Sequence, residues 1–416
     1  MSRVSTYDLI VVGAGPAGAH LALRMARAGF SVALLDRKRF PRPKACGEFL
    51  SPECAPLLAE LGLYEPVVAA GAWPVAGMDL HGYGRHARGG FVPVGPYAAP
   101  LEHGLAVRRE VLDAIAVRAA AARTEVHLAE GHTVTGVLRD ADGAVTGVTV
   151  MDSEGEPGEL RARYTVGADG TRSAIARALD LWRPVPWLRR FALVTRYAEI
   201  ELGPRAEVHF FPRGYFAATP VDSGLFSVNL VVDEDHLRAS PLPAAEYFAA
   251  QLRHVPAFAE KLARGRRGEA VRGIGPMACT TTTPVFAGGA LVGDACGYVD
   301  PVTGEGLFFA MRGAELLAGE LATALHAGRT GPRALEGYRR ARRREFGPRL
   351  TMARLLQRGL RSGLVTKTFL GLLQRRPRLA DLLVSVTGDY APPRALLAPK
   401  VWWPALTSCA GSVAGA

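Results

Sequence analysis

Cysteine is scarce in this 416-residue sequence, which has only five, at positions 46, 54, 279, 296 and 409. The number is odd, the spacing is wide, and no two of them form a Cys-x-x-Cys pair. Disulfide scaffolds and structural zinc sites need closely spaced sets of such residues, so the sequence argues against both. We therefore predict reduced thiols, no bound metal and a cytoplasmic location.

Signals for secretion and for membrane spanning are also missing. The apolar run 7–12 leads directly into a glycine-rich loop, without the basic region and cleavage site of a signal peptide. The longest uncharged stretch, residues 273–293, contains Pro276, Pro284 and repeated glycine, which a lipid-exposed helix does not tolerate well. The 47 glycines and 29 prolines follow no repeat period, which excludes collagen-like and solenoid folds. We expect a soluble globular protein.

Acidic residues are nearly absent from one segment. Residues 329–378 carry 15 Lys and Arg but only two acids, a local charge of +13 in a chain whose net charge is +11. The remainder is nearly neutral, so the question of a charged partner belongs to this segment. The composition of the whole chain, with 49% hydrophobic residues, is that of two or three globular domains of ~150 residues each.

The first functional pattern is a glycine turn between two predicted strands. A β-branched apolar run at 7–12 leads into Gly13-x-Gly15-x-x-Gly18, and a helix-compatible stretch and a second strand follow. That strand ends in Asp36, 21 residues after Gly15. The glycines permit a tight turn and close approach of the backbone to a pyrophosphate, and the acid accepts hydrogen bonds from a ribose. The pattern predicts a dinucleotide site.

Two further glycine turns follow predicted strands. One runs from Gly293-Asp294 into the segment 300–306, Asp-Pro-Val-Thr-Gly-Glu-Gly, and the other is Gly167-Ala168-Asp169-Gly170. Backbone N–H groups of the first turn can face an anionic ligand, but the same residues also suit a simple helix cap. The second, taken alone, is more typical of an ordinary turn.

In order and spacing, the three turns resemble the FAD-dependent oxidoreductases of the para-hydroxybenzoate hydroxylase-like fold. Within that group the chain is most similar to the geranylgeranyl reductase family. The resemblance covers residues 7 to about 325 and rests on residues 11–18, the loop Lys44-x-Cys46-Gly47-x-x-Leu50-Ser51-Pro52, Arg108 before an Ala-rich helix, residues 167–170 and residues 293–306.

The resemblance implies an α/β (α+β) fold, in which a Rossmann-type FAD-binding domain is interleaved with a mostly antiparallel substrate-binding sheet and followed by C-terminal helices. The implied FAD-binding domain comprises residues 1–74, 101–184 and 271–328. The implied sheet domain comprises 75–100 and 185–270, and residues 329–416 form a basic, mostly helical region.

The resemblance also implies which residues hold FAD. The glycine turn and Asp36 would hold the ADP half, Arg108 the pyrophosphate region and Asp294 the ribityl chain, with the turn 301–306 against the isoalloxazine. The full implied set is Gly13, Gly15, Pro16, Ala17, Gly18, Asp36, Arg37, Cys46, Arg108, Asp169, Gly293, Asp294, Pro301, Gly304, Glu305 and Gly306. NAD(P)H would be a transient electron donor, because no second Rossmann glycine motif follows.

Three residues are candidates for chemistry on the substrate, namely Cys46, His209 and Tyr215. Arg42 and Lys44 would favour the Cys46 thiolate, although a free cysteine in a tight loop is commonly buried and inert. The other two flank an aromatic segment of the predicted sheet, where each either lines the cavity or donates a proton.

The leading hypothesis is reduction of a C=C bond in an apolar, prenyl- or polyketide-like substrate by hydride transfer from flavin N5. The Cys46 loop and the turn 301–306 favour it, whereas the lack of tryptophan in 207–212 speaks against polyprenyl specificity. The alternative is a monooxygenase that hydroxylates an aromatic or polyketide-like ring through a C4a-hydroperoxide, although Cys296-Gly297 stands where aromatic hydroxylases commonly carry histidine. Halogenation fits less well, because none of the five lysines suits the handling of hypohalous acid.

A third hypothesis is a non-enzymatic flavin-binding protein of the membrane surface. Arginines beside leucine-rich helices, together with Trp402-Trp403, suit an anionic lipid surface, so residues 329–403 are a predicted peripheral membrane contact. Such a contact would help a lipid-like substrate to enter, whereas the alternative is a solvated arginine-rich tail. Nucleic acid is not expected, because no recognition module accompanies the charge. The oligomeric state is left open.

Overall fold

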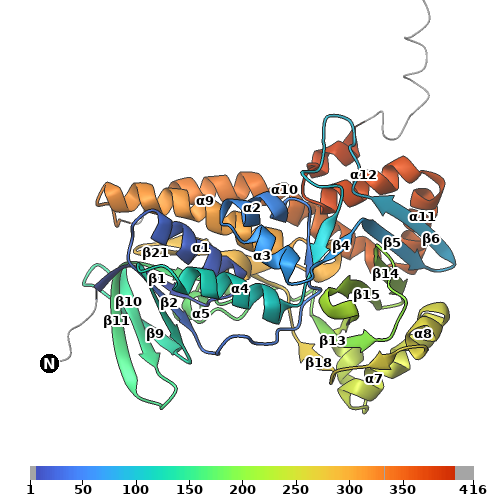
Figure 1. Ribbon diagram of the computed structural model, residues 1–416, viewed down its shortest axis with the longest axis horizontal. Helices are drawn as coiled ribbons and strands as arrows, with labels where there is room; N and C mark the ends of the chain where they lie inside the picture. The colour runs from blue at the N-terminus through green and yellow to red at the C-terminus, as the bar shows by residue number, and fades with distance from the viewer. Residues whose placement is uncertain (1–5, 332, 399–416) are drawn as a thin grey trace, which may run out of the picture.

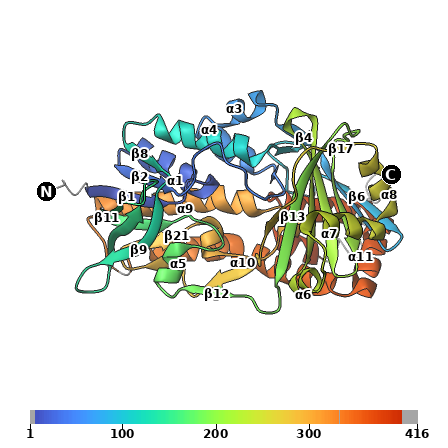
Figure 2. The same cartoon turned by 90° about the horizontal axis from the view of Figure 1, so that it is seen from below.

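Two large sheets, with helices packed between and around them, make up the protein in the computed structural model, which describes residues 6–331 and 333–398. The first sheet lies on the left of Figure 1 and the second on the right. Helices α9 (Gly306–His326) and α10 (Glu336–Leu360) extend along the long axis between the two, as the orthogonal view in Figure 2 also shows.

The first sheet is built around β1 (Thr6–Val12), whose last four residues are apolar and buried. Both of its neighbours, β2 (Val32–Asp36) and β11 (Pro157–Gly167), run parallel to it. The sheet is completed by β8 (Val126–Glu130), β9 (Thr133–Arg139), β10 (Val145–Met151), β20 (Val285–Phe286) and β21 (Gly289–Leu291). Parallel pairing brings the carboxyl ends of β1, β2, β11 and β21 to one edge, where ligands bind in sheets of this kind.

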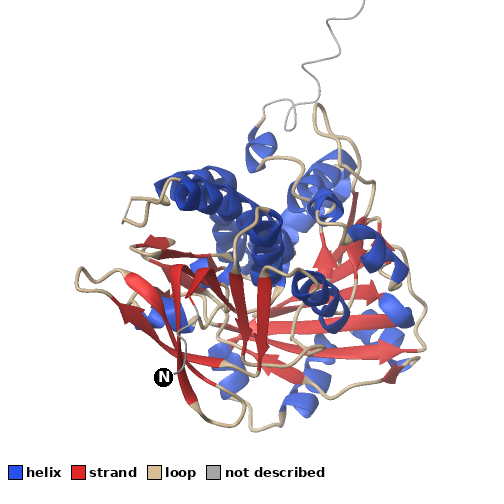
Figure 3. Ribbon diagram, turned by 60° about the vertical axis from the view of Figure 1, so that its left-hand side comes forward, coloured by secondary structure: helices blue, strands red, loops and turns tan. Residues whose placement is uncertain are grey.

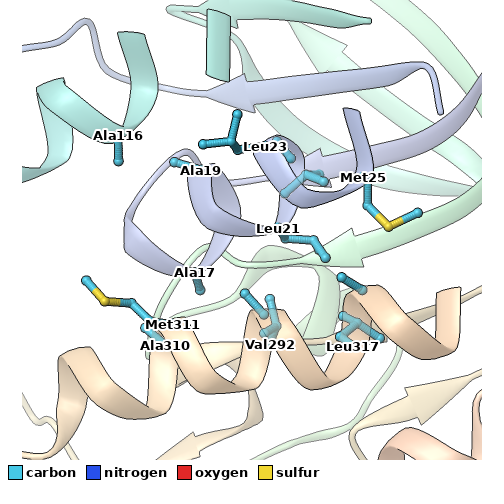
Figure 4. Packing of buried hydrophobic residues seen from close by; sticks show 14 of the residues in the cluster. Ala17, Ala19, Leu21, Leu23, Met25, Ala116, Val292, Ala310, Met311 and Leu317 are labelled. Atoms are coloured by element: carbon cyan, nitrogen blue, oxygen red, sulfur yellow. The ribbon is translucent and has the colours of Figure 1, made fainter. Parts of the chain in front are cut away.

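Helix α1 (Pro16–Arg27) packs between this sheet and α9 (Figure 4). Small side chains such as Ala17 on α1 and Ala310 on α9 are buried in this contact and allow the two helices to approach closely. The same face carries α2 (Cys54–Glu60), α3 (Tyr64–Ala69) and α4 (Arg109–Ala121), while α5 (Ala174–Ala178) lies against β9 and β11.

The second sheet has the order β17-β13-β16-β15-β14-β5-β6, with β18 beside β13. All of its pairs are antiparallel except β14 with β5. Its strands are β5 (Gly77–Gly82), β6 (Arg85–Gly90), β13 (Arg190–Ala198), β14 (Ala206–Phe211), β15 (Gly214–Val221), β16 (Leu225–Asp233), β17 (Arg266–Arg267) and β18 (Arg272–Ile274). The mixed fold class expected from the sequence is confirmed, with a parallel-centred sheet and a mostly antiparallel one drawn from interleaved segments.

Helices cover both faces of the second sheet. One face packs against α7 (Ala244–Gln251) and α8 (Pro256–Ala263), and the other against α11 (Gly363–Arg375) and α12 (Pro377–Thr387). Figure 3 shows the strands in the lower part of the molecule and most of the long helices above them. Short elements complete the chain: α6 (Glu234–Arg238), β3 (Phe49–Leu50), β4 (Trp73–Val75), β7 (Gly104–Ala106), β12 (Trp182–Pro184), β19 (Cys279–Thr281), β22 (Gly297–Tyr298), and the 3-10 turns at Asp222–Gly224, Leu252–His254 and Pro393–Leu397.

The C-terminal helices are part of the packed body of the protein. Phe346 of α10 is buried in the same core as α1 and α9, and Leu370 and Ala380 of α11 and α12 pack against the second sheet. In the ranges that the structure describes, no helix combines the length and apolarity needed to cross a bilayer. Trp402, Trp403 and the rest of the predicted membrane-contact segment beyond residue 398 lie outside the described residues.

Candidate active site

In the glycine turn that joins β1 to α1, an added Cβ would clash with backbone atoms at two of the three glycines and would meet free space at the third. Gly13 has a φ of 99°, and a Cβ there would lie 2.6 Å from a backbone oxygen just after β11. A Cβ on Gly18 would lie 1.8 Å from the Gly13 carbonyl oxygen. At Gly15, by contrast, the nearest atoms are guanidinium nitrogens of Arg42 and Arg109, at 3.7 and 4.0 Å. The space before Gly15 therefore faces two cations, which suits an anionic group at a helix N-terminus.

The N-terminus of α1 carries nothing of its own that would compete with such a ligand. Pro16 and Ala17 form its first turn, which has no acidic residue and no side-chain cap. Arg109 is buried nearby and donates two 2.8 Å hydrogen bonds to Asp113. Burial opposes its charge, but Asp113 and Cys46 together outweigh burial and hold the pKa of Arg109 above its usual value. A permanent cation thus lies beside the open turn.

Two carboxylates predicted to bind the nucleotide lie next to these cations. Asp36 accepts hydrogen bonds from the backbone N–H of Ala14 at 3.0 Å, and Arg42 is 3.4 Å from the same carboxylate oxygen. Asp294 lies in the 3-10 turn Gly293–Cys296, far along the chain but within electrostatic reach of Lys44 and Arg109. Burial raises the pKa of Asp294, and these two cations oppose the increase. Charged side chains, namely Asp36, Arg42, Arg109 and Lys44, therefore lie between the first glycine turn and Asp294.

The structure also shows where three other predicted nucleotide ligands lie, and one of them, Asp169, borders the glycine turn, with its Cα 2.8 Å from the position of a Cβ on Gly13. Arg108 donates to Asp222 through Nε at 2.8 Å, so its side chain ties α4 to the second sheet. Arg37 is exposed, and Asp169 accepts a 2.6 Å hydrogen bond from a backbone N–H at the start of α5. The arginine beside Gly15 is Arg109, which sequence reasoning missed. The two arginines are adjacent at the start of α4, Arg108 as its N-cap and Arg109 as its first residue, and the sequence carries no signal that distinguishes them.

The turn after Asp294 is built on a buried carboxylate. Asp300 is the N-terminal cap of the 3-10 turn Pro301–Thr303, and it accepts hydrogen bonds from the Val302 N–H at 3.0 Å and from the Tyr215 hydroxyl at 2.6 Å. Its second oxygen is 4.0 Å from the Arg190 guanidinium. Burial raises the pKa of Asp300, and Arg190 opposes the increase. Tyr215, predicted as a catalytic residue, therefore holds this turn against the second sheet.

The same turn is held from its other end by α10. Gly304 adopts the left-handed conformation, with φ 72°, and Gly306 begins α9. The Glu305 side chain is buried and points to Arg349 of α10, with 3.4 Å between Oε1 and Nη1. Arg349 also lies 3.2 Å from the buried carboxylate of Asp389. The C-terminal region thus supplies the partner of a residue predicted to contact the cofactor.

Cys46 lies at the charged group that surrounds Gly15. It is half-buried, its Sγ accepts a 3.4 Å hydrogen bond from the Glu48 N–H, and it is close enough to the Arg109 guanidinium to interact with it electrostatically. Lys44 and Tyr298 are also close enough to interact with it electrostatically. The structure thus brings Cys46 together with Asp294 and the cations beside the glycine turn.

An apolar cavity adjoins the turn 301–306, between the second sheet and the C-terminal helices. It has a volume of about 50 Å³, and threonines are its only polar lining residues among those described. It is lined by Met78, Leu80 and Phe210 from the sheet, Val302 and Thr303 from the turn, and Leu356, Leu360, Thr366, Phe369, Leu370, Leu383, Val384 and Thr387 from α10–α12. The cavity has the composition of a site for a hydrocarbon-like molecule.

His209 does not reach this cavity. Side chains alternate between the faces of a strand, and Phe210, the next residue of β14, is the one that lines the cavity. The His209 ring instead stacks on Phe258 of α8, with centroids 4.2 Å apart, and its Nε2 is 3.0 Å from Glu207. This position argues against the proton-donor role predicted for His209.

Residues 6–353 match the family model described as FAD binding domain, so the chain belongs to the FAD-binding domain family of flavoproteins. It is an FAD-dependent oxidoreductase, and the open turn, the cations and the two acids fit an extended flavin nucleotide.

A digeranylgeranylglycerophospholipid reductase of Methanopyrus kandleri is 30% identical over 82% of this chain and 83% of its own. A menaquinone reductase of Mycobacterium tuberculosis is 28% identical, with coverage of 76% and 77%. The myxobacterial chondrochloren halogenase CndH superposes with a TM-score of 0.76 at 28% identity, covering 85% of this chain and 82% of that one. The resemblance to geranylgeranyl reductases is confirmed at the level of the family.

Proposed function

We propose that this flavoprotein uses electrons from NAD(P)H to reduce a carbon–carbon double bond in an apolar, prenyl- or polyketide-like substrate. The observation that carries the proposal is the apolar cavity against Val302 and Thr303, the turn implied to lie beside the flavin ring. A molecule that fills it meets hydrocarbon side chains and no charged group among the described lining residues. Two reductases among the relatives bear the names of lipid-like substrates, in agreement with this chemistry.

The residues of the chain divide the work between binding and positioning. The N-terminus of α1, Arg42 and Arg109 would bind the pyrophosphate, and Asp36 would bind the adenosine ribose. FAD reduced by NAD(P)H would supply the hydride that one carbon of the double bond gains, and the other carbon would take a proton from water. Asp300 and Tyr215 hold the turn in place beside the cavity. Leucine, valine and phenylalanine of the C-terminal helices line the cavity, so a bound substrate displaces water from an apolar surface.

The chondrochloren halogenase shares the fold, and its name indicates a different reaction, halogenation. Halogenation by hypohalous acid was expected to need a lysine, and no lysine lines the apolar cavity among the described residues. The cavity supports a reaction that leaves the substrate hydrocarbon-like. Reduction meets that description.

The test is product mass. The FAD-loaded protein is incubated without oxygen with NADPH or NADH and with prenylated lipids or a menaquinone. Reduction predicts a gain of two hydrogens per double bond. A gain of one oxygen that requires air would instead establish the monooxygenase, and a halogenated product in the presence of halide would establish a halogenase.

A cavity-filling variant links the product to the site. Met78→Trp places a large ring in the apolar cavity and is expected to lower turnover at least tenfold, while FAD content stays unchanged. Leu242→Trp, at an exposed position of the second-sheet region, is the matched control and is expected to retain turnover. Equal activity of both variants would show that substrate does not occupy this cavity.

A further inference from the structure

The hairpin of α10 and α11 exposes apolar side chains to solvent. Leu364 is 76% exposed, Leu355 61% and Val365 51%, all within eleven residues of sequence. We call these three residues the apolar tip. Exposed large hydrophobic residues are unremarkable when they occur singly, but a cluster on one hairpin marks an interaction site.

The hairpin that carries the apolar tip is also basic. Arg354, Arg358, Arg361 and Lys367 lie on the same hairpin, and none of them has a carboxylate within 4.0 Å in the described part of the chain. Residues 346–380 contain no Asp or Glu at all. Arg358 stacks over the half-buried Trp187 ring, 4.5 Å from its centroid, which adds an amphipathic aromatic side chain beside the hairpin. The hairpin therefore exposes apolar side chains, and every charged residue between positions 346 and 380 is basic.

The same hairpin forms one wall of the apolar cavity. Leu356, Leu360, Thr366 and Phe369 line the cavity, while Leu355, Leu364 and Val365, their close neighbours in sequence, face solvent. Three of the four lining residues, Leu356, Leu360 and Phe369, are themselves only half-buried. A hydrocarbon chain that left a bilayer beneath the tip would thus meet apolar side chains along its way to the cavity.

We propose that the α10–α11 hairpin docks on an anionic lipid bilayer, with the apolar tip inserted among the acyl chains and the four basic residues against lipid headgroups. Charge complementarity selects this occupant: a hairpin whose four cations have no carboxylate partner among the described residues suits phosphorylated lipid headgroups. Three apolar side chains are few for a stable protein interface, which buries about 800 Å² on each partner. The link from docking to substrate entry rests on the proposed function, but the docking itself does not.

The experiment is co-sedimentation of the full-length, FAD-loaded protein with vesicles. We expect binding to vesicles of 70% phosphatidylcholine and 30% phosphatidylglycerol, and weak binding to phosphatidylcholine alone. The double variant Leu364→Ser/Val365→Ser should lose at least tenfold in affinity, and Arg358→Gln/Lys367→Gln about fivefold per charge removed. Leu242→Ser and Arg253→Gln/Arg264→Gln are matched controls, because these residues are exposed elsewhere, and they should bind like the wild type.

Two outcomes would overturn the docking proposal. One is equal binding of the tip variant and the Leu242→Ser control, and the other is a dimer that the tip variant dissociates, which would make a second copy the occupant. FAD content and thermal melting confirm that each variant is folded. Vesicle binding without any reduced product would refute the proposed function and leave the docking standing, so the two failures are distinguishable.

Discussion

Arg349→Met tests whether the C-terminal helices hold the turn 301–306. Arg349 is buried and is the cation that faces Glu305 and Asp389, at 3.4 and 3.2 Å, and its Nη1 also donates to the Val386 carbonyl at 2.8 Å. Its removal leaves two buried carboxylates facing each other without a cation. Losing one partner of a buried ion pair costs about 3–5 kcal/mol, which is a large share of the stability of a domain.

The measurement is urea unfolding followed by tryptophan fluorescence, with retained FAD read from the ratio of flavin to protein absorbance. We expect a loss of about 3–5 kcal/mol for Arg349→Met together with partial loss of FAD. Arg344→Met is the matched control, because Arg344 is an exposed arginine of the same helix, and a change within about 0.5 kcal/mol is expected. Equal effects of the two variants would refute the argument that this buried cluster holds the turn.

The cluster also predicts a dependence on pH. Burial raises the pKa of Glu305, and burial together with the Glu305 charge raises that of Asp389. The folded state then binds more protons than the unfolded state between the ordinary and the raised pKa values, so stability falls as pH rises through that window. Without Arg349 the fall should be steeper. A defect in Arg349→Met that does not grow from pH 5 to pH 8 would contradict this reasoning.

Three further predictions address the nucleotide turn, the tyrosine and a buried histidine. Gly18→Ala is expected to abolish FAD binding, because the added methyl would lie 1.8 Å from the Gly13 carbonyl oxygen, whereas Gly319→Ala, with no atom within 4 Å, should retain full flavin absorbance. Tyr215→Phe removes the 2.6 Å hydrogen bond to Asp300 and should cost about 1–3 kcal/mol in urea unfolding, while Tyr83→Phe should be neutral. His20 is buried without a hydrogen-bond partner, and burial, with the Arg24 charge, lowers its pKa from 6.5 to about 3. The unfolded state therefore binds the extra proton between these values, and stability should fall by up to about 1.4 kcal/mol per pH unit as pH drops below 6.5. His20→Leu should remove that slope, and an unchanged slope would exclude His20 as its source.

Alternation along a strand separates two residues that looked alike in the sequence. His209 and Tyr215 flank one aromatic segment, and both were candidate proton donors. Residue 209 pairs with Phe216 and residue 210 with Tyr215 in the β14–β15 register, so the two candidates lie on opposite faces of the sheet. The register is set by strand pairing and by the short turn between the strands. The sequence alone could not show on which face of the sheet His209 and Tyr215 lie, because that depends on the pairing of the two strands.

The sequence by itself determined the nucleotide turn and the fold class. Tight glycine turns after buried strands leave few backbone alternatives, so Gly13, Gly18 and Asp36 could be placed from spacing alone. These constraints are local, because the missing Cβ atoms of the glycines and the end of the second strand lie within about thirty residues of one another along the chain.

Only the tertiary structure decided the partners of the charged residues. Arg109 rather than Arg108 faces Gly15, and Arg349, 44 residues beyond Glu305, holds that carboxylate. The basic C-terminal segment lines the apolar cavity with its leucines, while Arg358, Arg361 and Lys367 are exposed on the surface. Electrostatic and apolar contacts depend on distance through space, and packing brings together groups whose separation along the chain carries no information.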